Sequence, residues 1–410
     1  MSTGLMGTRF PWLNKPPLAS LLAALNGGGE EARVVGGSVR NALLGEQVVE
    51  WDIATSALPE EVSTRARVMG WKTVPTGIEH GTVTVVVDGH PFEVTTLRED
   101  IETDGRHAVV RFGRDFRADA FRRDFTINAI SLSLDGTLHD YAGGLDDIAA
   151  RRVRFIGKAE QRIAEDYLRI LRLFRFHARY GVGPIDPESF SAAIRGREGL
   201  RQLSAERIRA ELLKLVMAAR AGEVLAEIDG AGFLAIILGG VARVGNFSRL
   251  ISLEERSGIA PDPVRRLAVL CLFTRLDAER LAKKLRLSNA EAKRFLSIAL
   301  LLEAERSMPS PSRARELLYR LGQAAFEDGM LALAAQRPDE EFSEVFALPA
   351  AWKAPRPPFG GKDIARLGVE PGPRVGRILA RAEQAWIDEG FPENRELRQA
   401  ILADAVRVTP

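Results

Sequence analysis

The chain has 410 residues, of which 46% are hydrophobic and 27% are charged. This length is too great for one compact core, so we expect a folded protein of several packed domains. The formal net charge is only +2, so any RNA-binding surface has to come from local clustering of basic residues. The single cysteine, Cys271, excludes an intramolecular disulfide and favours a buried thiol in a reducing setting.

The N-terminal residues 1–15 lack the uninterrupted apolar stretch of a signal peptide. No later run approaches the ~18 apolar residues that a membrane span needs. We therefore predict a cytoplasmic protein without a membrane partner.

Residues 33–134 carry the signals of a mixed sheet with helices. Short β-branched runs at 33–35, 51–55, 82–87 and 92–97 alternate with turn signals. The dipeptide Asp88-Gly89 separates two of these runs and favours the positive backbone angles of a tight hairpin turn.

After about residue 160 the strand signals fade, and apolar residues recur at helical spacing nearly to the end. Segments rich in Pro and Gly or Ser at 307–312 and 354–361 interrupt this pattern and predict domain junctions. The predicted fold is an α/β head, a mixed β-sheet with helices, followed by three all-α units.

A glycine pair follows the predicted strand at 33–35 and precedes a short predicted helix. Paired glycines let a phosphate approach the backbone, and the free N–H groups at the start of a helix favour an anion. This segment supplies Gly37 for the approach, Ser38 as a hydroxyl donor and Arg40 as a fixed charge. An isolated pair is also typical of a simple turn, so nucleotide binding here depends on the motifs that follow.

Two carboxylates, Glu50 and Asp52, stand at the start of a predicted strand. Residues two apart in a strand share a face, and two like charges held that close favour a hard divalent cation, magnesium or manganese. Glu93 lies on the strand face opposite Phe92 and Val94, from which it could reach the same metal as a third carboxylate. The alternatives are a solvated strand edge for the pair and a charge on the polar side of a half-buried strand for Glu93.

A second motif begins with two adjacent arginines, Arg122 and Arg123, which offer clamps for a triphosphate. Asp124 and Asn128 in the same motif could bind the ribose hydroxyls by hydrogen bonds. An exposed basic turn is the alternative interpretation of the bare pattern.

A third motif lies on a predicted helix that presents Glu165, Asp166, Arg169 and Arg172 on one side. A carboxylate and a guanidinium at this spacing could present an acceptor and a forked donor to the edge of a base. A surface helix with ion pairs three residues apart is the alternative. The apolar stripe of the same helix consists of Ile163, Tyr167, Ile170, Leu171 and Phe174.

Together these motifs resemble the class II tRNA nucleotidyltransferases and the bacterial poly(A) polymerases, members of the DNA polymerase beta superfamily. The resemblance covers almost the whole chain. It is carried by the segments at 36–40, 50–56, 122–129, 143–147, 165–172, 206–212 and 361–376.

The resemblance implies a chain of domains. These are an N-terminal extension at 1–30, a catalytic nucleotidyltransferase head at 31–155, a base-recognising neck at 156–225, a helical body at 226–352 and a helical, tRNA-binding tail at 353–410.

The resemblance also implies a reaction and its participants. Carboxylates that bind two magnesium ions promote attack of the RNA 3′ hydroxyl on the α-phosphate of CTP or ATP, with release of pyrophosphate. Asp166 and Arg169 select the base, and Glu165 orients the arginine. The implied partners are the 3′ end of tRNA, CTP and ATP, and no protein partner is predicted.

Two positions depart from the family's pattern, because Glu50 and Asn41 stand where it normally has aspartates. Magnesium demands near-ideal octahedral geometry, so a glutamate one methylene longer must retract or shift the ion. Both residues support an alternative, a degenerate homologue that binds RNA without turnover. The arginine and base-reading motifs favour an active enzyme.

Two further features bear on which nucleotides are added. The segment 97–108 resembles the flexible loop that CC-only enzymes lack, so we expect addition of the terminal adenosine. Poly(A) polymerases usually carry a strongly basic C-terminal extension, and the absence of one before Pro410 favours CCA addition. The five histidines reveal no His-Asp phosphohydrolase pairing, so no second hydrolytic activity is expected.

Overall fold

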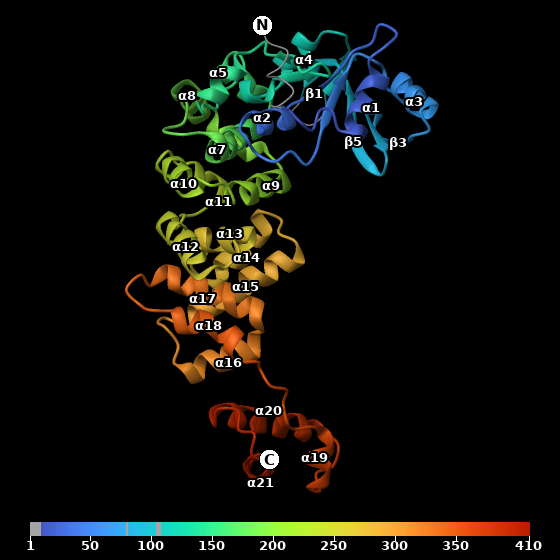
Figure 1. Ribbon diagram of the computed structural model, residues 1–410. Coiled ribbons are helices and arrows are strands. Elements are labelled where there is room, and N and C mark those ends of the chain that lie inside the picture. Colours follow the sequence, from blue (N-terminus) through green and yellow to red (C-terminus); the bar gives the residue numbers. More distant parts are fainter. Residues whose placement is uncertain (1–9, 79–80, 104–107) are drawn as a thin grey trace. The chain divides into compact units, whose positions relative to one another are not determined.

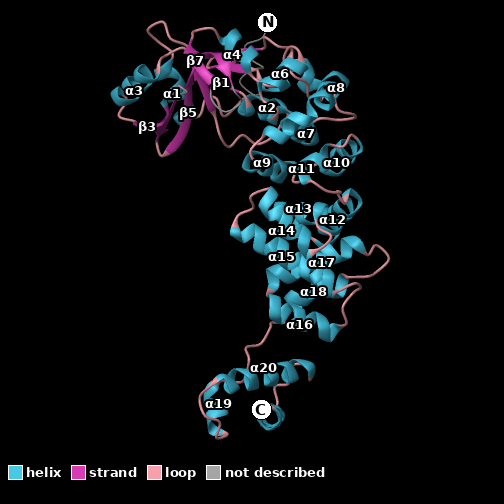
Figure 2. Ribbon diagram, turned by 180° about the vertical axis from the view of Figure 1, so that it is seen from behind, coloured by secondary structure: helices cyan, strands magenta, loops and turns pink. Residues whose placement is uncertain are grey.

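The computed structural model describes residues 10–78, 81–103 and 108–410 (Figure 1). The chain divides into two compact units, Met1–Gly239 and Gly240–Pro410. All described strands belong to the first unit, whereas the described elements of the second unit are helices (Figure 2). The predicted α/β head followed by helices is confirmed.

Seven strands of the described part of the chain form one sheet, in the order β3-β4-β5-β2-β1-β8-β9. The pairing of β2 with β5 is parallel, and the other neighbours are antiparallel. A separate hairpin consists of β6 and β7. The strands are β1 (Ala32–Val35), β2 (Asp52–Thr55), β3 (Lys72–Gly77), β4 (Thr82–Val87), β5 (His90–Thr96), β6 (Arg98–Thr103), β7 (Ala108–Phe112), β8 (Ser131–Ser133) and β9 (Leu138–His139).

The predicted strands at 33–35, 82–87 and 92–97 correspond to β1, β4 and β5. The predicted hairpin between β4 and β5 is also confirmed, because Asp88 and Gly89 have φ angles of 49° and 81°. Alternation along β4 leaves every second residue buried, as expected of a strand with one face toward the core.

One predicted strand is shorter than expected. The run at 51–55 becomes β2 only from Asp52 onward, so Glu50 precedes the strand instead of sharing a face with Asp52. Strand β3 was not predicted; it is an edge strand that is largely exposed and has an irregular register after Val74. Its polar residues carry no apolar alternation by which a strand could be recognised.

The first unit contains eleven α-helices among its described residues, together with the 3-10 helices η2 (Thr126–Asn128) and η3 (Arg197–Gln202). The α-helices are α1 (Pro16–Leu25), α2 (Gly37–Leu43), α3 (Pro59–Val68), α4 (Phe116–Arg122), α5 (Gly144–Ala149), α6 (Ala159–Glu165), α7 (Leu168–Tyr180), α8 (Pro187–Gly196), α9 (Ala205–Leu215), α10 (Ala221–Gly230) and α11 (Phe233–Leu238).

Helix α1 lies within residues 1–30, the predicted N-terminal extension, and belongs to the packed structure of the head. It packs against α3 and against strands β1 and β4. Its four leucines, Leu18, Leu21, Leu22 and Leu25, are each at most 1% exposed. Residues 16–25 are therefore part of the core that supports the sheet.

The helix predicted across residues 165–172 is two helices. Asp166 has extended backbone angles, with φ −158° and ψ 108°, and separates α6 from α7. Its Oδ1 atom accepts a hydrogen bond from the Leu168 backbone N–H at 3.0 Å, and so satisfies one of the free donors at the start of α7. The predicted apolar residues Ile163 and Ile170 are both buried, but they lie on different helices.

Two buried clusters lie toward the C-terminal end of the second unit, in addition to buried residues earlier in it such as Phe247 and Leu267. One cluster joins residues of α15 to α18, including Leu301 and Ala314, and the other lies among α19, α20 and α21 around Trp386. The described helices are α12 (Val244–Ser257), α13 (Pro263–Cys271), α14 (Arg275–Lys284), α15 (Asn289–Ala304), α16 (Pro311–Leu321), α17 (Gln323–Gln336), α18 (Ser343–Ala351), α19 (Gly361–Arg366), α20 (Pro373–Asp388) and α21 (Arg395–Val408).

Two predicted junctions are corrected by this packing. The boundary between residues 225 and 226 falls inside α10, whereas the compact units meet at Gly239 and Gly240. The segment at 307–312 is a loop within one core, because Leu301 before it and Ala314 after it belong to the same buried cluster. Proline and serine there end a helix without ending a domain.

The remaining global expectations concern membranes and the cysteine. No described helix is long and apolar enough to cross a membrane. Cys271 is buried at the end of α13, as predicted, and burial raises the pKa of its thiol. The thiol is therefore protonated and unreactive at neutral pH.

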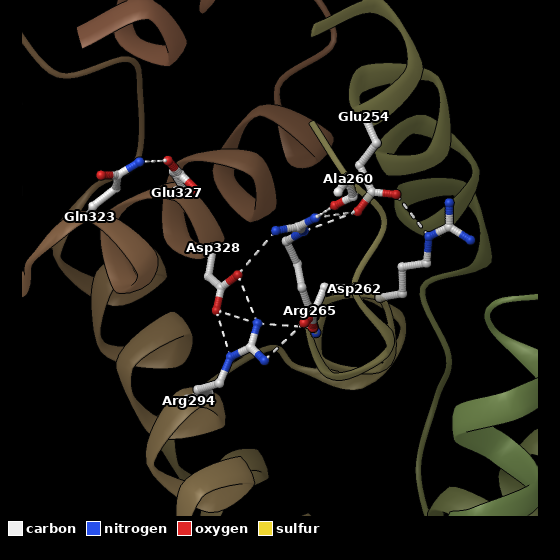
Figure 3. Close-up of polar contacts among 9 residues, drawn as sticks. Glu254, Ala260, Asp262, Arg265, Arg294, Gln323, Glu327 and Asp328 are labelled. Carbon is white, nitrogen blue, oxygen red and sulfur yellow. Dashed lines mark hydrogen bonds and ion pairs between the residues drawn. The ribbon is translucent and has the colours of Figure 1, made fainter. Parts of the chain in front are cut away.

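A buried network of charges links α12, α13, α15 and α17 in the second unit (Figure 3). Glu254 accepts from Arg265 at 2.9 Å and from Arg266 at 2.8 Å. Asp328 accepts from Arg265 at 3.3 Å and from Arg294 at 2.8 Å. Such a network contributes little net stability when complete, but the loss of one member weakens the compensation of the buried charges that remain.

We expect Glu254→Gln to destabilise the protein by about 3–5 kcal/mol, because two buried arginines then lose their shared carboxylate. The measurement is the free energy of unfolding in urea. Glu255→Gln is the matched control, since Glu255 is the exposed neighbour on the same helix, and should change stability by less than about 0.5 kcal/mol. Equal effects of the two substitutions would contradict the energetic role assigned to the network.

Candidate active site

A glycine turn between β1 and α2 allows two arginines to lie against the backbone. Gly36 has φ 70°, a conformation that strains other residues. A Cβ atom on Gly36 would lie 3.1 Å from Arg123 Nη1, and one on Gly37 would lie 3.4 Å from Arg40 Nη2. The missing side chains therefore make room for positive charge beside the start of α2.

Asp52 and Glu93 lie side by side in the sheet. They are register partners in the parallel pair of β2 and β5, and Glu93 is exposed between buried Phe92 and Val94, as predicted. Asp52 faces an open cleft but is crowded by protein atoms. This partial loss of water, followed by the negative charge of Glu93, raises the pKa of the Asp52 carboxyl above its usual value.

Glu50 reaches the same region from the segment before β2. The Ser38 hydroxyl donates to the Glu50 carbonyl at 3.0 Å and accepts from the Asp52 backbone N–H at 3.4 Å. Ser38 therefore fixes the backbone that carries both carboxylates, whereas the sequence analysis had placed it on a phosphate. No three His, Cys, Asp or Glu side chains in the described ranges are arranged to hold one metal ion, and the predicted three-carboxylate metal site stays a prediction.

The chemistry of the pair Asp52 and Glu93 nevertheless fits a divalent cation. Neither carboxylate has an ion pair with any residue of the described chain, and the negative charge of Glu93 raises the energy of the charged form of Asp52. Magnesium is commonly bound through one or two carboxylates, with substrate phosphates and water as the other ligands. Glu50 lies beside Asp52 and its negative charge also raises the Asp52 pKa, so an ion at the pair would be within the influence of all three groups.

Asp119 holds the two predicted triphosphate clamps. It accepts from Arg122 Nη2 at 2.7 Å and from Arg123 Nη2 at 3.0 Å. Burial alone would raise the pKa of Asp119, but the two guanidinium groups lower it below its usual value. Asp119 was not predicted as a site residue, although its helical spacing of three and four residues from the two arginines is a signal that identifies it.

Asp124 connects the head to α7. Its Oδ2 atom accepts from Arg172 Nη2 at 2.5 Å, and its Oδ1 atom accepts from Asn128 Nδ2 at 3.0 Å and from the Phe125 N–H at 2.9 Å. Burial would raise the pKa of Asp124, but Arg172 and Asn128 outweigh it and hold the pKa below its usual value. Both oxygens of Asp124 are thus engaged by protein groups, and the predicted ribose contact stays a prediction.

The third motif is arranged around the break between α6 and α7. Arg169 forms an ion pair with Glu165 through Nη1 and donates to the Arg162 carbonyl at 2.7 Å. Asp166 is paired with Arg207 of α9 at 2.7 Å, and not with Arg169. The contact of Glu165 with Arg169 is the arrangement that the predicted orienting role requires.

These groups meet at one cleft of about 750 Å³ within the first unit. Of the residues predicted from sequence, the lining includes Gly37, Arg40, Glu50, Asp52, Arg123, Asp124, Asn128, Asp166, Arg169 and Arg172. Lining residues that were not among the predicted site residues are Gly36, Leu168, Arg175, Phe176, Arg207 and Lys214.

A smaller cavity of about 260 Å³ adjoins the cleft, since Asp52 and Arg123 line both. Glu93 and Arg122 line this smaller cavity only. Of the predicted site residues, Ser38 and Glu165 line neither, and they act on their neighbours through the contacts given above. The loop predicted at 97–108 includes residues 104–107, which lie outside the described residues.

Arg40 stands out in the cleft as a buried cation. It is 6% exposed and donates to Asn128 Oδ1, to the Asn41 Oδ1 atom and to the Tyr180 hydroxyl. The Tyr180 ring also lies 4.2 Å from the guanidinium carbon. Asn41 and Tyr180 were not predicted as site residues.

Comparisons with known proteins agree with this geometry. A family model described as "Poly A polymerase head domain" matches residues 32–154, nearly the range predicted for the head. A second model, "Probable RNA and SrmB- binding site of polymerase A", matches residues 184–243.

The similarity to individual proteins extends over almost the whole chain. The mitochondrial CCA tRNA nucleotidyltransferase 1 of Danio rerio is 34% identical over 92% of this chain and 88% of its own length. The CCA-adding enzyme of Leuconostoc citreum is 34% identical over 90% of each chain. The crystal structure of the Bacillus stearothermophilus CCA-adding enzyme in complex with CTP superposes with a TM-score of 0.72, at 28% identity over 96% of this chain and 98% of that one. In sequence and in structure, therefore, the chain belongs to the class II CCA-adding enzymes, the CCA tRNA nucleotidyltransferases of the polymerase beta superfamily.

Proposed function

We propose that this protein adds cytidine, cytidine and adenosine to the 3′ end of tRNA from CTP and ATP, without a nucleic-acid template. One observation carries the proposal: the cleft and the cavity that adjoins it bring the carboxylates, several arginines and the base-reading motif together. The family membership supports it, because relatives at 34% identity are named for this activity.

Asp52 and Glu93 are the carboxylates that we assign to the metal, with Glu50 as a third group beside them. Two bound magnesium ions, or manganese ions, would activate the RNA 3′ hydroxyl and offset the charge of the α-phosphate as pyrophosphate leaves. The protein's own part is to hold Asp52 at the start of β2, where Ser38 fixes the backbone. Partial desolvation and the charge of Glu93 disfavour the charged form of Asp52. A bound cation would offset both effects and stabilise the carboxylate.

Arginines on two sides of the cleft are suited to the triphosphate. Arg123 and Arg40 lie against the glycine turn, and Arg122 lines the adjoining cavity. Arginine binds phosphate oxygens in a forked geometry, and its charge persists at every physiological pH. Asp119 fixes the directions of Arg122 and Arg123, so less conformational entropy is lost when phosphate binds.

Asp166 and Arg169 are assigned to base selection. Both line the cleft from the break between α6 and α7. Glu165 holds the Arg169 side chain, and Arg207 holds the Asp166 carboxylate at 2.7 Å. A carboxylate has about four lone pairs, so Asp166 can still accept from the exocyclic amino group that cytosine and adenine share.

The alternatives are poly(A) addition and a degenerate homologue that only binds RNA. The deciding experiment is incubation with tRNA that lacks its CCA end, with each of the four labelled nucleotides in turn and sequencing of the added bases. CCA addition requires two cytidines and then one adenosine. The cytoplasmic location expected from the single buried cysteine stays a prediction.

We expect Asp52→Ala to abolish nucleotide addition while tRNA binding stays nearly unchanged, because the substitution removes a metal ligand and no RNA contact. Single-turnover assays in magnesium and a tRNA-binding assay measure the two effects. Glu60→Ala, which removes an exposed carboxylate on α3, is the control and should be active. Appreciable turnover by Asp52→Ala would rule out the metal role.

Glu50 provides a separate test, because it lies outside the strand that carries Asp52. If Glu50 is a metal ligand, Glu50→Asp should keep activity within about tenfold, equivalent to ~1.4 kcal/mol of activation free energy. Glu50→Ala should lose far more. Equal rates for the two variants would place Glu50 outside the metal's ligands.

Asp166→Ala should increase incorporation of UTP or GTP relative to CTP, because the acceptor for the exocyclic amino group is lost. Its metal dependence should not change. The loss of the hydrogen bond to the Leu168 N–H will also lower stability by about 1 kcal/mol, so Asp186→Ala, which removes the N-cap of α8, is the matched control. Competition among the four nucleotides is the readout, and an unaltered preference in both Asp166→Ala and Arg169→Ala would contradict base selection by these residues.

A further inference from the structure

The charge of Arg40 has no carboxylate partner in the part of the chain that the structure describes. All its hydrogen bonds go to neutral oxygens. Asn41 Oδ1 accepts from Nε at 3.1 Å and from Nη2 at 2.9 Å. The Tyr180 hydroxyl accepts from Nη2 at 2.8 Å, and Asn128 Oδ1 accepts from Nη1. A buried arginine is ordinarily paired, because removing an uncompensated charge from water is costly.

The surroundings of Arg40 stabilise its charge only in part. The rings of Tyr180 and Phe176 lie 4.2 and 5.2 Å from its guanidinium carbon, within the range of cation–π attraction. Glu46 and Asp52 are carboxylates near enough to act on Arg40 through space, but Glu46 is paired with Arg179 at 3.2 Å and Asp52 forms no ion pair with Arg40. Burial and the positive charge of Arg179 lower the pKa of Arg40, while Tyr180 and Glu46 offset part of that effect. The protein therefore holds this cation without neutralising it.

Asn41 is the residue on which this balance depends. Its amide oxygen meets two of the arginine's nitrogens, and an aspartate of almost the same shape could accept both hydrogen bonds with a full negative charge. We propose that Asn41 is a positioning residue that fixes the Arg40 guanidinium without neutralising it, and so reserves that positive charge for the phosphates of the incoming nucleotide. The inference rests on the proposed function, because it needs a nucleoside triphosphate in the cleft.

The inference predicts two opposite effects of Asn41→Asp. The new carboxylate pairs with a buried, uncompensated guanidinium, so the protein becomes more stable to heat. The same pairing cancels the charge that the triphosphate would meet, so CTP binds about tenfold more weakly, equivalent to ~1.4 kcal/mol. The KM for CTP rises correspondingly, and kcat changes little. Cytidine, which has no phosphate, binds the variant as well as it binds the wild type.

The experiment measures thermal unfolding and the binding of CTP and of cytidine for the wild type, Asn41→Asp and Asn41→Ser. Serine keeps a neutral acceptor but fits less well, so that variant should lose stability and keep CTP affinity within about threefold, equivalent to ~0.65 kcal/mol. Asn246→Asp is the matched control. Asn246 Oδ1 accepts from Arg249 in the second unit, so this variant introduces the same charge beside an arginine outside the cleft and should leave CTP binding unchanged.

Three results would overturn the inference: CTP affinity that is unchanged in Asn41→Asp, a lower melting temperature for that variant, or an affinity loss in Asn41→Ser as large as in Asn41→Asp. The last result would show that Asn41 acts through geometry alone. Failure of the proposed function is distinguishable, because the wild type would then not bind CTP or extend tRNA. The gain in thermal stability would still be expected, since it depends only on the unpaired charge of Arg40.

Discussion

The parallel pairing of β2 with β5 is the contact on which the site depends. It places Asp52 beside Glu93, two like charges that the fold brings together at an energetic cost. The rest of the first unit maintains that arrangement. The core beneath the sheet includes the leucines of α1, and Ser38 fixes the backbone just before β2. The metal that the carboxylates are proposed to bind would relieve the repulsion.

Arginines provide the positive charges of the site, and they differ in whether a carboxylate of the protein pairs with them. Arg172 is paired with Asp124, and Arg122 and Arg123 share Asp119. Each pair fixes a direction and reduces the net charge that a ligand meets. Arg40 alone among these four has only neutral partners. Carboxylates of the protein thus partly neutralise Arg122, Arg123 and Arg172 and fix their directions, whereas the charge of Arg40 is largely retained.

Much of the fold and of the site could be predicted from sequence, for identifiable reasons. β4 and the Asp88-Gly89 turn have strong local signals, and the clustered motifs are consecutive in the chain. The predictions that failed concern features that depend on tertiary structure. The exposed edge strand β3 has no apolar period, and the break at Asp166 arises from a side chain bonding to the Leu168 N–H, which competes with helical continuity. The pairing of Asp166 with Arg207, forty-one residues away, has no local signal either.

The cleft is lined only by residues between Gly36 and Lys214, all within the first compact unit. The second unit has its own buried cores and its own internal charge network. Selection on the chemistry of nucleotide addition therefore acts directly on about half of the chain. Residues 240–410 line no part of that cleft and pack around cores of their own, so a substitution inside those cores is expected to change stability without changing which nucleotide the cleft binds.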